Sequence, residues 1–178
     1  MFSLAQKIAN LLCSFWLTAA RRSGIPEGEI VPQVRRVVRR FPYWARGQLL
    51  VGEAALSGGD LRTAYGAAKA SVTLRPSCAL SWVFLSRCHL AGHQFEVAVE
   101  HARTALNLDP SLHAAREELA AALIPLNRLD EARTYLLEIP QIAHNPNIFG
   151  MLAYLRALEE GGGLATTPNV PNDKSPLD

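Results

Sequence analysis

Apolar residues recur at intervals of three and four along most of the chain, which is the spacing of α-helices and not of strands. Between residues 49 and 71 the pattern forms two such stretches, Leu49–Leu56 and Ala64–Ser71, separated by a short polar segment containing two glycines. Equivalent pairs follow further along the chain. The pattern therefore predicts an all-α fold of successive helical hairpins.

Three kinds of residue recur with a period of 34: proline at 42, 76 and 110, glycine at 24, 58 and 92, and alanine at 64, 98 and 132. We expect each glycine to end one helix, because a residue just past a helix end often needs a positive φ angle. We expect each proline to follow the next helix, where its missing N–H breaks no helical hydrogen bond. The predicted unit is helix, glycine turn, helix, proline.

The clearest copy of this unit, residues 79–112, carries Trp82, Leu85, Ala98 and Pro110 at its marked positions. It resembles the tetratricopeptide repeat, with Ser86, His89 and Ala102 in place of the usual Gly, Tyr and Phe. The resemblance implies a right-handed α-solenoid of helix-turn-helix pairs with a C-terminal capping helix. It also implies that the first helices line a concave groove for a partner.

The period divides the chain into four parts. Residues 1–44 hold an N-terminal amphipathic helix and a degenerate first repeat, and residues 45–146 hold three repeats. Residues 147–160 form a capping helix begun by Asn145 and Pro146, and residues 161–178 lack periodicity and are expected to be a disordered tail. About nine helices result. Pro140 is expected to shorten the second helix of the last repeat.

Counting along each first helix from the recurring positions of the repeat predicts which residues share the face that lines the groove. They are mostly apolar, which favours a peptide or an amphipathic helix of another protein as the occupant. The double substitution Leu49→Glu with Val83→Glu is expected to abolish capture of the partner while leaving the helical content of the protein intact. Glu53 and Arg87 either anchor the partner or pair with each other, and the lysine and asparagine clamp of some relatives is absent. The predicted lining residues are Arg46, Leu49, Glu53, Leu56, Leu80, Val83, Arg87, Leu90, Glu117, Ala121 and Ile124, extended by Met151 and Leu155.

The N-terminal segment has one apolar stripe and three interpretations. It is the opening helix of the stack, a signal peptide, or a helix that lies on a membrane surface. A basic patch follows it, made of Arg35, Arg36, Arg39 and Arg40, which is either a solvated face or a surface for anionic lipid. The alternative function is therefore a membrane-peripheral assembly scaffold, with self-association as one mode. Nucleic acid is less favoured, since aromatic residues do not interleave with the basic ones.

Composition narrows the range of functions. Apolar residues make up 49% of the chain and charged residues 19%, an ordinary globular mixture. Residues 1–76 carry a balance of +7 and the remainder one of −5, so the two ends of the chain differ in charge. Three cysteines do not make a disulfide scaffold and favour a reducing, cytoplasmic setting, whereas a cleaved signal peptide would imply a periplasmic or secreted protein.

Catalytic and metal-binding patterns were sought in the same way. Cys88, His89 and His93 are close in sequence, but no CxxC pair accompanies them, and His89 stands where the repeat packs an aromatic ring. Phosphate-loop, nucleophile-elbow and zinc-protease motifs are absent from the sequence. We therefore expect a non-catalytic protein-binding scaffold with no metal and no cofactor.

Overall fold

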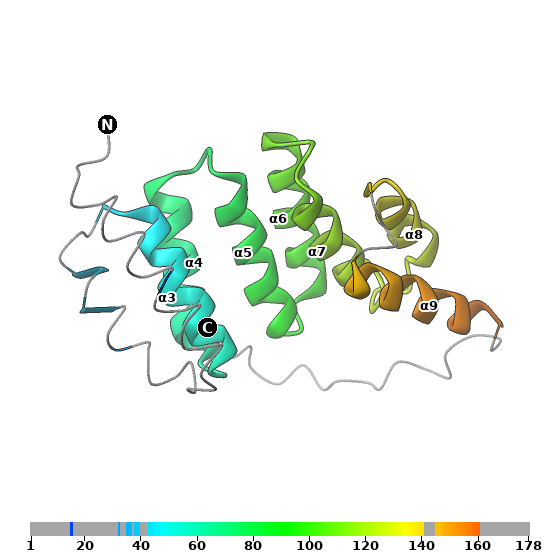
Figure 1. Ribbon diagram of the computed structural model, residues 1–178, viewed down its shortest axis with the longest axis horizontal. Coiled ribbons are helices and arrows are strands. Elements are labelled where there is room, and N and C mark those ends of the chain that lie inside the picture. Colours follow the sequence, from blue (N-terminus) through cyan, green and yellow to red (C-terminus); the bar gives the residue numbers. More distant parts are fainter. Residues whose placement is uncertain are drawn as a thin grey trace.

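The computed structural model describes Phe15, Pro32, Arg35, Arg36, Val38, Arg39 and residues 43–140 and 145–160. Within residues 43–160 it contains seven helices, and the described part of the chain has no strand (Figure 1). The predicted all-α repeat fold is confirmed, while the predicted N-terminal helix and the tail lie outside the described residues. The helices are α3 (Ala45–Ser57), α4 (Leu61–Leu74), α5 (Ala79–Ala91), α6 (Phe95–Leu108), α7 (His113–Leu123), α8 (Leu129–Leu137) and α9 (Pro146–Glu160).

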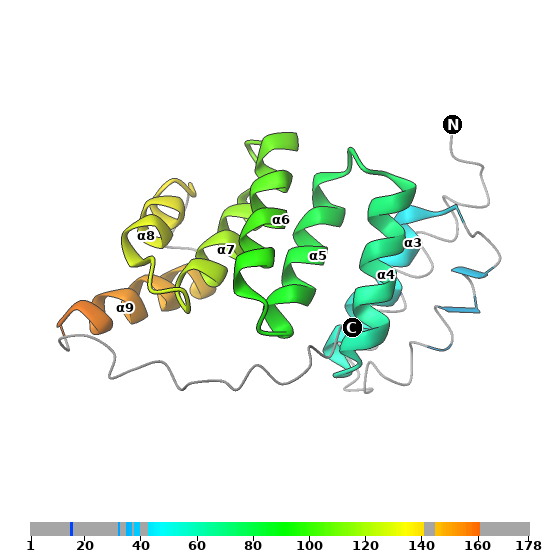
Figure 2. The ribbon, with the colours of Figure 1, turned by 180° about the vertical axis from the view of Figure 1, so that it is seen from behind.

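The helices keep the predicted period of 34 residues. The first helices of the three pairs begin at Ala45, Ala79 and His113, and the second helices begin at Leu61, Phe95 and Leu129. Successive pairs stand beside one another in a row, and α9 crosses the end of the row beneath α7 and α8 (Figures 1 and 2). Such a stack buries apolar surface mainly between neighbouring pairs, so its stability is a sum of local contacts.

The turn within each pair has the same backbone geometry in all three copies. Gly59, His93 and Asn127 occupy equivalent positions and have φ angles of +80°, +59° and +57°. The next residue donates its N–H to a carbonyl five residues earlier, as in Asp60 to Ala55, which is a Schellman-type helix end. The prediction that Gly58 and Gly92 supply the positive φ was wrong by one residue, since their φ angles are −82° and −87°.

Small residues lie where helices approach each other closely. A Cβ atom added at Gly52 would lie 2.4 Å from Phe84 Cε1 and 3.3 Å from Ala67 Cβ, so α3 is in contact with both α4 and α5. At the equivalent position in the next pair, the buried Ser86 donates its hydroxyl to the carbonyl of Ala98, 2.7 Å away. The small residues of the helix crossings, Gly52, Ala64, Ser86, Ala98, Ala120 and Ala132, are all buried.

Two large apolar clusters make up the core. One joins α3, α4 and α5 around Trp44, Leu50 and Phe84, and the other joins α6 to α9 around Leu119, Leu123 and other residues. Buried hydroxyl groups in the first cluster are satisfied. Ser71 donates to the carbonyl of Ala45 at 3.1 Å and shares a 2.8 Å hydrogen bond with Ser81. These bonds tie α3, α4 and α5 together and pair both buried serine hydroxyls.

The last pair differs from the others because α8 has only 9 residues, against 14 in α4 and α6. Pro140 follows α8 closely, which confirms the predicted early end. The shorter α8 is followed by α9, whose Ile148 and Leu155 are fully buried in the second core cluster. As predicted, α9 covers the end of the stack, beginning at Pro146. None of the described helices is long and apolar enough to cross a membrane.

Candidate functional site

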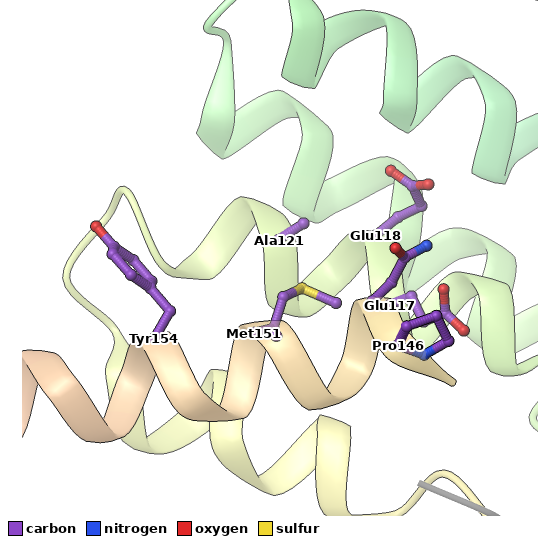
Figure 3. A pocket seen from close by; sticks show the side chains of 8 residues that line it. Glu117, Glu118, Ala121, Pro146, Met151 and Tyr154 are labelled. Atoms are coloured by element: carbon purple, nitrogen blue, oxygen red, sulfur yellow. The ribbon is translucent and has the colours of Figure 1, made fainter. Parts of the chain in front are cut away.

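The described chain has an open groove of about 520 Å³ between α7 and α9 (Figure 3). We call it the α7–α9 groove. Because α7 is a first helix and α9 occupies the next first-helix position, the groove lies on the predicted binding side of the stack. Its lining residues are Glu117, Glu118 and Ala121 from α7 and Pro146, Asn147, Gly150, Met151 and Tyr154 from α9.

The amphipathic pattern of α9 explains why the groove stays open. Ile148 and Leu155, seven residues apart, are buried against the core. Met151 is half-buried, Tyr154 is 50% exposed, and Gly150 has no other atom within 4 Å of a Cβ placed on it. The side chains that α9 turns away from the core thus form one wall of the groove, and Gly150 leaves a gap in that wall.

The N-terminus of α9 is joined to α7 by a polar contact. Asn145 accepts a hydrogen bond from the N–H of Asn147 at 3.0 Å, capping α9, and donates its own amide to Glu117 Oε1 at 2.9 Å. The Glu117 carboxylate therefore lies beside the N-terminus of α9. Among the described residues Asn145 is the one donor to Glu117, and a single amide donor uses only part of the acceptor capacity of a carboxylate.

Glu118, the second carboxylate of the groove, already has a cationic partner. Its Oε1 accepts a hydrogen bond from Arg87 Nε at 2.6 Å, and this ion pair joins α5 to α7. Burial raises the pKa of the Glu118 carboxyl, and the nearby Arg87 opposes that shift. The alternative pairing of Glu53 with Arg87 is not the one in the structure, because Arg87 pairs with Glu118.

The structure divides the predicted groove residues into separate groups. Glu117, Ala121 and Met151, three of the predicted residues, line the α7–α9 groove. Leu49 and Val83 are each only 4% exposed, and both belong to core clusters. They do not line an open surface. Glutamate at both positions would place two carboxylates in the core, so the double change is expected to destabilise the helices as well as to affect capture. The predicted extension to Leu155 fails likewise, since that side chain is fully buried.

The remaining predicted lining residues lie outside the α7–α9 groove. Leu56, Leu90 and Ile124 are partly buried and pack against the core clusters. Arg46, Leu80 and Arg87 are exposed and Glu53 is partly exposed, so these four remain accessible along α3 and α5.

Part of the basic patch borders a second cavity of about 480 Å³, where the chain before α3 meets α3 and α4. Arg35 and Arg39 line it, and Arg35 donates to the hydroxyl of Thr63 at 2.7 Å. Arg36 is exposed, whereas Arg40 lies outside the described residues. The structure therefore brings two of the four predicted arginines to one cavity.

Sequence reasoning missed five lining residues of the α7–α9 groove: Glu118, Pro146, Asn147, Gly150 and Tyr154. The pattern predicted α9 as a helix and as a cap. It did not predict the angle at which α9 crosses α7, because that angle depends on how Ile148 and Leu155 fit the end of the core. The lack of a large apolar residue at Gly150 was the one available signal.

The histidine cluster considered for metal binding has a packing role in the structure. His89 is buried, shares a 2.6 Å hydrogen bond between its Nδ1 and Gln94 Oε1, and contacts the rings of Tyr65 and His101. Among the described residues, no group of three or more His, Cys, Asp or Glu side chains is arranged to hold a metal ion.

The repeat geometry and the α7–α9 groove can now be set beside known proteins. Residues 89–155 match the family described as tetratricopeptide repeat. The fold of the chain is that of tetratricopeptide-repeat proteins. This match covers α6, α7, α8 and most of α9, and so includes both walls of the groove.

Solved tetratricopeptide-repeat structures share the fold at low sequence identity. TTC0263, a thermophilic protein of Thermus thermophilus, superposes with a TM-score of 0.73 and 17% identity over 88% of this chain and 83% of its own. MamA gives a TM-score of 0.63 and 16% identity, covering 80% and 83%. No curated protein matches the sequence.

A third similar structure belongs to an enzyme, the O-GlcNAc transferase of Thermobaculum terrenum. It has a TM-score of 0.59 and 23% identity, and the match covers 76% of this chain but only 28% of the transferase. The similarity concerns the helical repeat fold alone.

Proposed function

We propose that this protein is a non-catalytic scaffold or adaptor that binds a peptide or an amphipathic helix of a partner protein on the surface formed by α5, α7 and α9. Tetratricopeptide repeats mediate protein–protein interaction. The observation that carries the proposal for this chain is the α7–α9 groove, a hollow on the first-helix side walled by Ala121, Met151 and Tyr154. Half-exposed apolar side chains beside polar ones suit a peptide ligand.

Gly150 offers a way to block this groove without disturbing the core. A Cβ atom at Gly150 meets nothing within 4 Å, so Gly150→Phe places a ring in the groove. Gly66 is the matched control, since it is an exposed helical glycine on α4 that also has nothing within 4 Å. Both variants are expected to fold, because each replaces a helical glycine by a better helix former at an open position.

The experiment selects binders from a phage library of random peptides about four helical turns long. Synthetic versions of the selected peptides are then titrated by fluorescence anisotropy. We expect binding that Gly150→Phe weakens at least about tenfold, since a displaced apolar anchor contributes on the order of 1–2 kcal/mol. Gly66→Phe should leave affinity unchanged. Binding that is insensitive to Gly150→Phe would place the partner site elsewhere on the molecule.

The second candidate function, a membrane-peripheral scaffold, is supported by the exposure of Arg36 and Arg39 beside the second cavity. Such side chains attract anionic lipid headgroups by about 1 kcal/mol each near the surface. Flotation with phosphatidylcholine vesicles, with and without phosphatidylserine, tests it. Anionic vesicles should retain the wild type and release the double variant Arg36→Gln, Arg39→Gln.

A further inference from the structure

We propose that the α7–α9 groove selects a basic partner segment, one that places a lysine or arginine side chain against Glu117 and an apolar side chain against Met151 and Tyr154. The inference rests on the proposed function and specifies the chemistry of the partner. It follows from three properties of the groove: where its unbalanced charge lies, how that charge is held, and how far it is from the aromatic end.

The unbalanced charge lies on Glu117. Of the two groove carboxylates, Glu118 is paired with Arg87, whereas the described residues place only the neutral amide of Asn145 against Glu117. The two glutamates are adjacent on α7, so each adds to the negative potential at the other. A cation brought into the groove would therefore find its strongest attraction at Glu117.

The charge of Glu117 is held in place before any ligand arrives. The Asn145 amide fixes one carboxylate oxygen at 2.9 Å, and Asn145 itself is fixed by its cap on α9. Ion pairs between flexible surface residues usually cost side-chain entropy. A carboxylate that is already held in place loses little of this freedom when it forms an ion pair. Its half-buried position also weakens competition from water and salt.

Covering the groove with an uncharged segment would be unfavourable. A purely apolar occupant would take Glu117 out of water without replacing its hydrogen bonds, and an acidic occupant would add like-charge repulsion. The apolar part of the groove equally disfavours a segment that is charged throughout. The groove chemistry therefore favours one cationic side chain combined with an apolar one.

The geometry of α9 sets the spacing between these two side chains. Glu117 lies at the start of α9 beside Asn145, and Tyr154 lies at the other end of the groove, with Met151 and Ala121 between them (Figure 3). From Asn145 to Tyr154 the helical rise corresponds to about 13 Å. A helical partner would span this with a basic and an apolar residue about nine positions apart, and an extended partner with about four.

The test uses the peptides selected from the random library and one conservative variant, Glu117→Gln. The variant keeps the oxygen that accepts from Asn145, so the cap of α9 is retained while the charge is removed. Glu96→Gln, at an exposed position on α6 outside the groove, is the matched control. Affinities are measured by anisotropy in low and high salt.

We expect the selected peptides to be enriched in lysine or arginine at the stated spacing from an apolar residue. Replacing the basic residue by glutamine, or changing Glu117→Gln, should weaken binding roughly five- to tenfold, and the two changes together should weaken it little further. Glu96→Gln should have no effect. Loss of affinity should be smaller in high salt, where the pair is screened.

The two failures are distinguishable. Peptides whose binding depends on Gly150 but shows no basic preference and no response to Glu117→Gln would overturn the inference and leave the proposed function standing. Peptides that ignore Gly150→Phe would refute both. Sedimentation velocity of the chain alone tests whether a second copy of this chain occupies the groove. Dimers that are lost on Glu117→Gln would assign the groove to the basic segment of a second copy and overturn the inference of a separate partner.

Discussion

Replacing Gly52 by alanine tests whether helix crossings in this stack are as close as the structure describes. Gly52 lies within α3, where alanine is intrinsically the better helix former by about 1 kcal/mol. The new methyl group, however, would lie 2.4 Å from Phe84 Cε1 and 2.9 Å from Phe84 Cζ. Propensity and packing therefore act in opposite directions at this residue.

The size of the two effects decides the sign. The Phe84 ring is only 4% exposed and packs within the first core cluster, so it has little room to move aside. Overpacking a filled core costs about 1–3 kcal/mol, which exceeds the gain in helix propensity. We expect Gly52→Ala to lower the free energy of unfolding by up to about 2 kcal/mol.

Gly66→Ala is the control that isolates packing from propensity. Gly66 lies within α4 and a Cβ there meets nothing within 4 Å, so the same substitution should stabilise the protein by about 1 kcal/mol. Urea unfolding followed by circular dichroism measures both variants. In thermal unfolding their midpoints should differ by up to about 6–12 °C, because about 1 kcal/mol shifts the midpoint of a chain of this size by about 2–4 °C. Equal stabilisation by the two alanines would refute the close contact between α3 and Phe84.

Three further predictions concern single residues. His93→Gly should raise the free energy of unfolding by about 0.5–1 kcal/mol in urea titrations, because His93 holds a φ of +59° that glycine adopts without strain; an unchanged midpoint would argue against that turn. Burial and the nearby His89 lower the pKa of His101, so folding favours its neutral ring. The free energy of unfolding should therefore be highest above the ordinary pKa of 6.5 and fall as the pH drops through that value. His101→Phe should flatten this dependence between about pH 8 and pH 5, while the exposed His113→Gln should not. Burial raises the pKa of Cys88 to about 12, which keeps its thiol protonated and unreactive. Peptide mapping after iodoacetamide treatment of the folded protein should therefore find the half-exposed Cys78 modified and Cys88 intact. Modification of Cys88 at a similar rate would contradict its burial.

Much of the fold could be predicted from the sequence because the residues that recur in the repeat determine local structure, namely the helices and the turns between them. The 34-residue spacing of the alanines, glycines and prolines predicted the repeating helix pairs, and α3 to α8 begin with that period. The turn was misplaced by one residue because two adjacent positions, Gly58 and Gly59, are both glycine. In the other copies histidine and asparagine adopt the positive φ, so composition alone did not mark the residue.

The candidate site was predicted less well, for a physical reason. Helical offsets tell which residues share a face, and three of the residues that they indicated, Glu117, Ala121 and Met151, line the α7–α9 groove. They do not tell how much of that face a neighbouring helix covers, and so Leu49 and Val83 were expected on the surface although they are buried. The hollow itself depends on the angle between α7 and α9, which is a property of packing at one end of the core and not of any local pattern.

The shared phase of the helix pairs has an engineering consequence. Because equivalent helices and turns recur every 34 residues up to the start of α8, a duplicate of residues 79–112 inserted after Leu112 would present matching faces to the pairs on both sides. Such a chain would be longer by one helix pair, yet α7, α8 and α9 would keep their mutual arrangement. The distance between the arginine-rich end and the peptide-sized hollow is thus adjustable in whole steps, independently of the chemistry at either end.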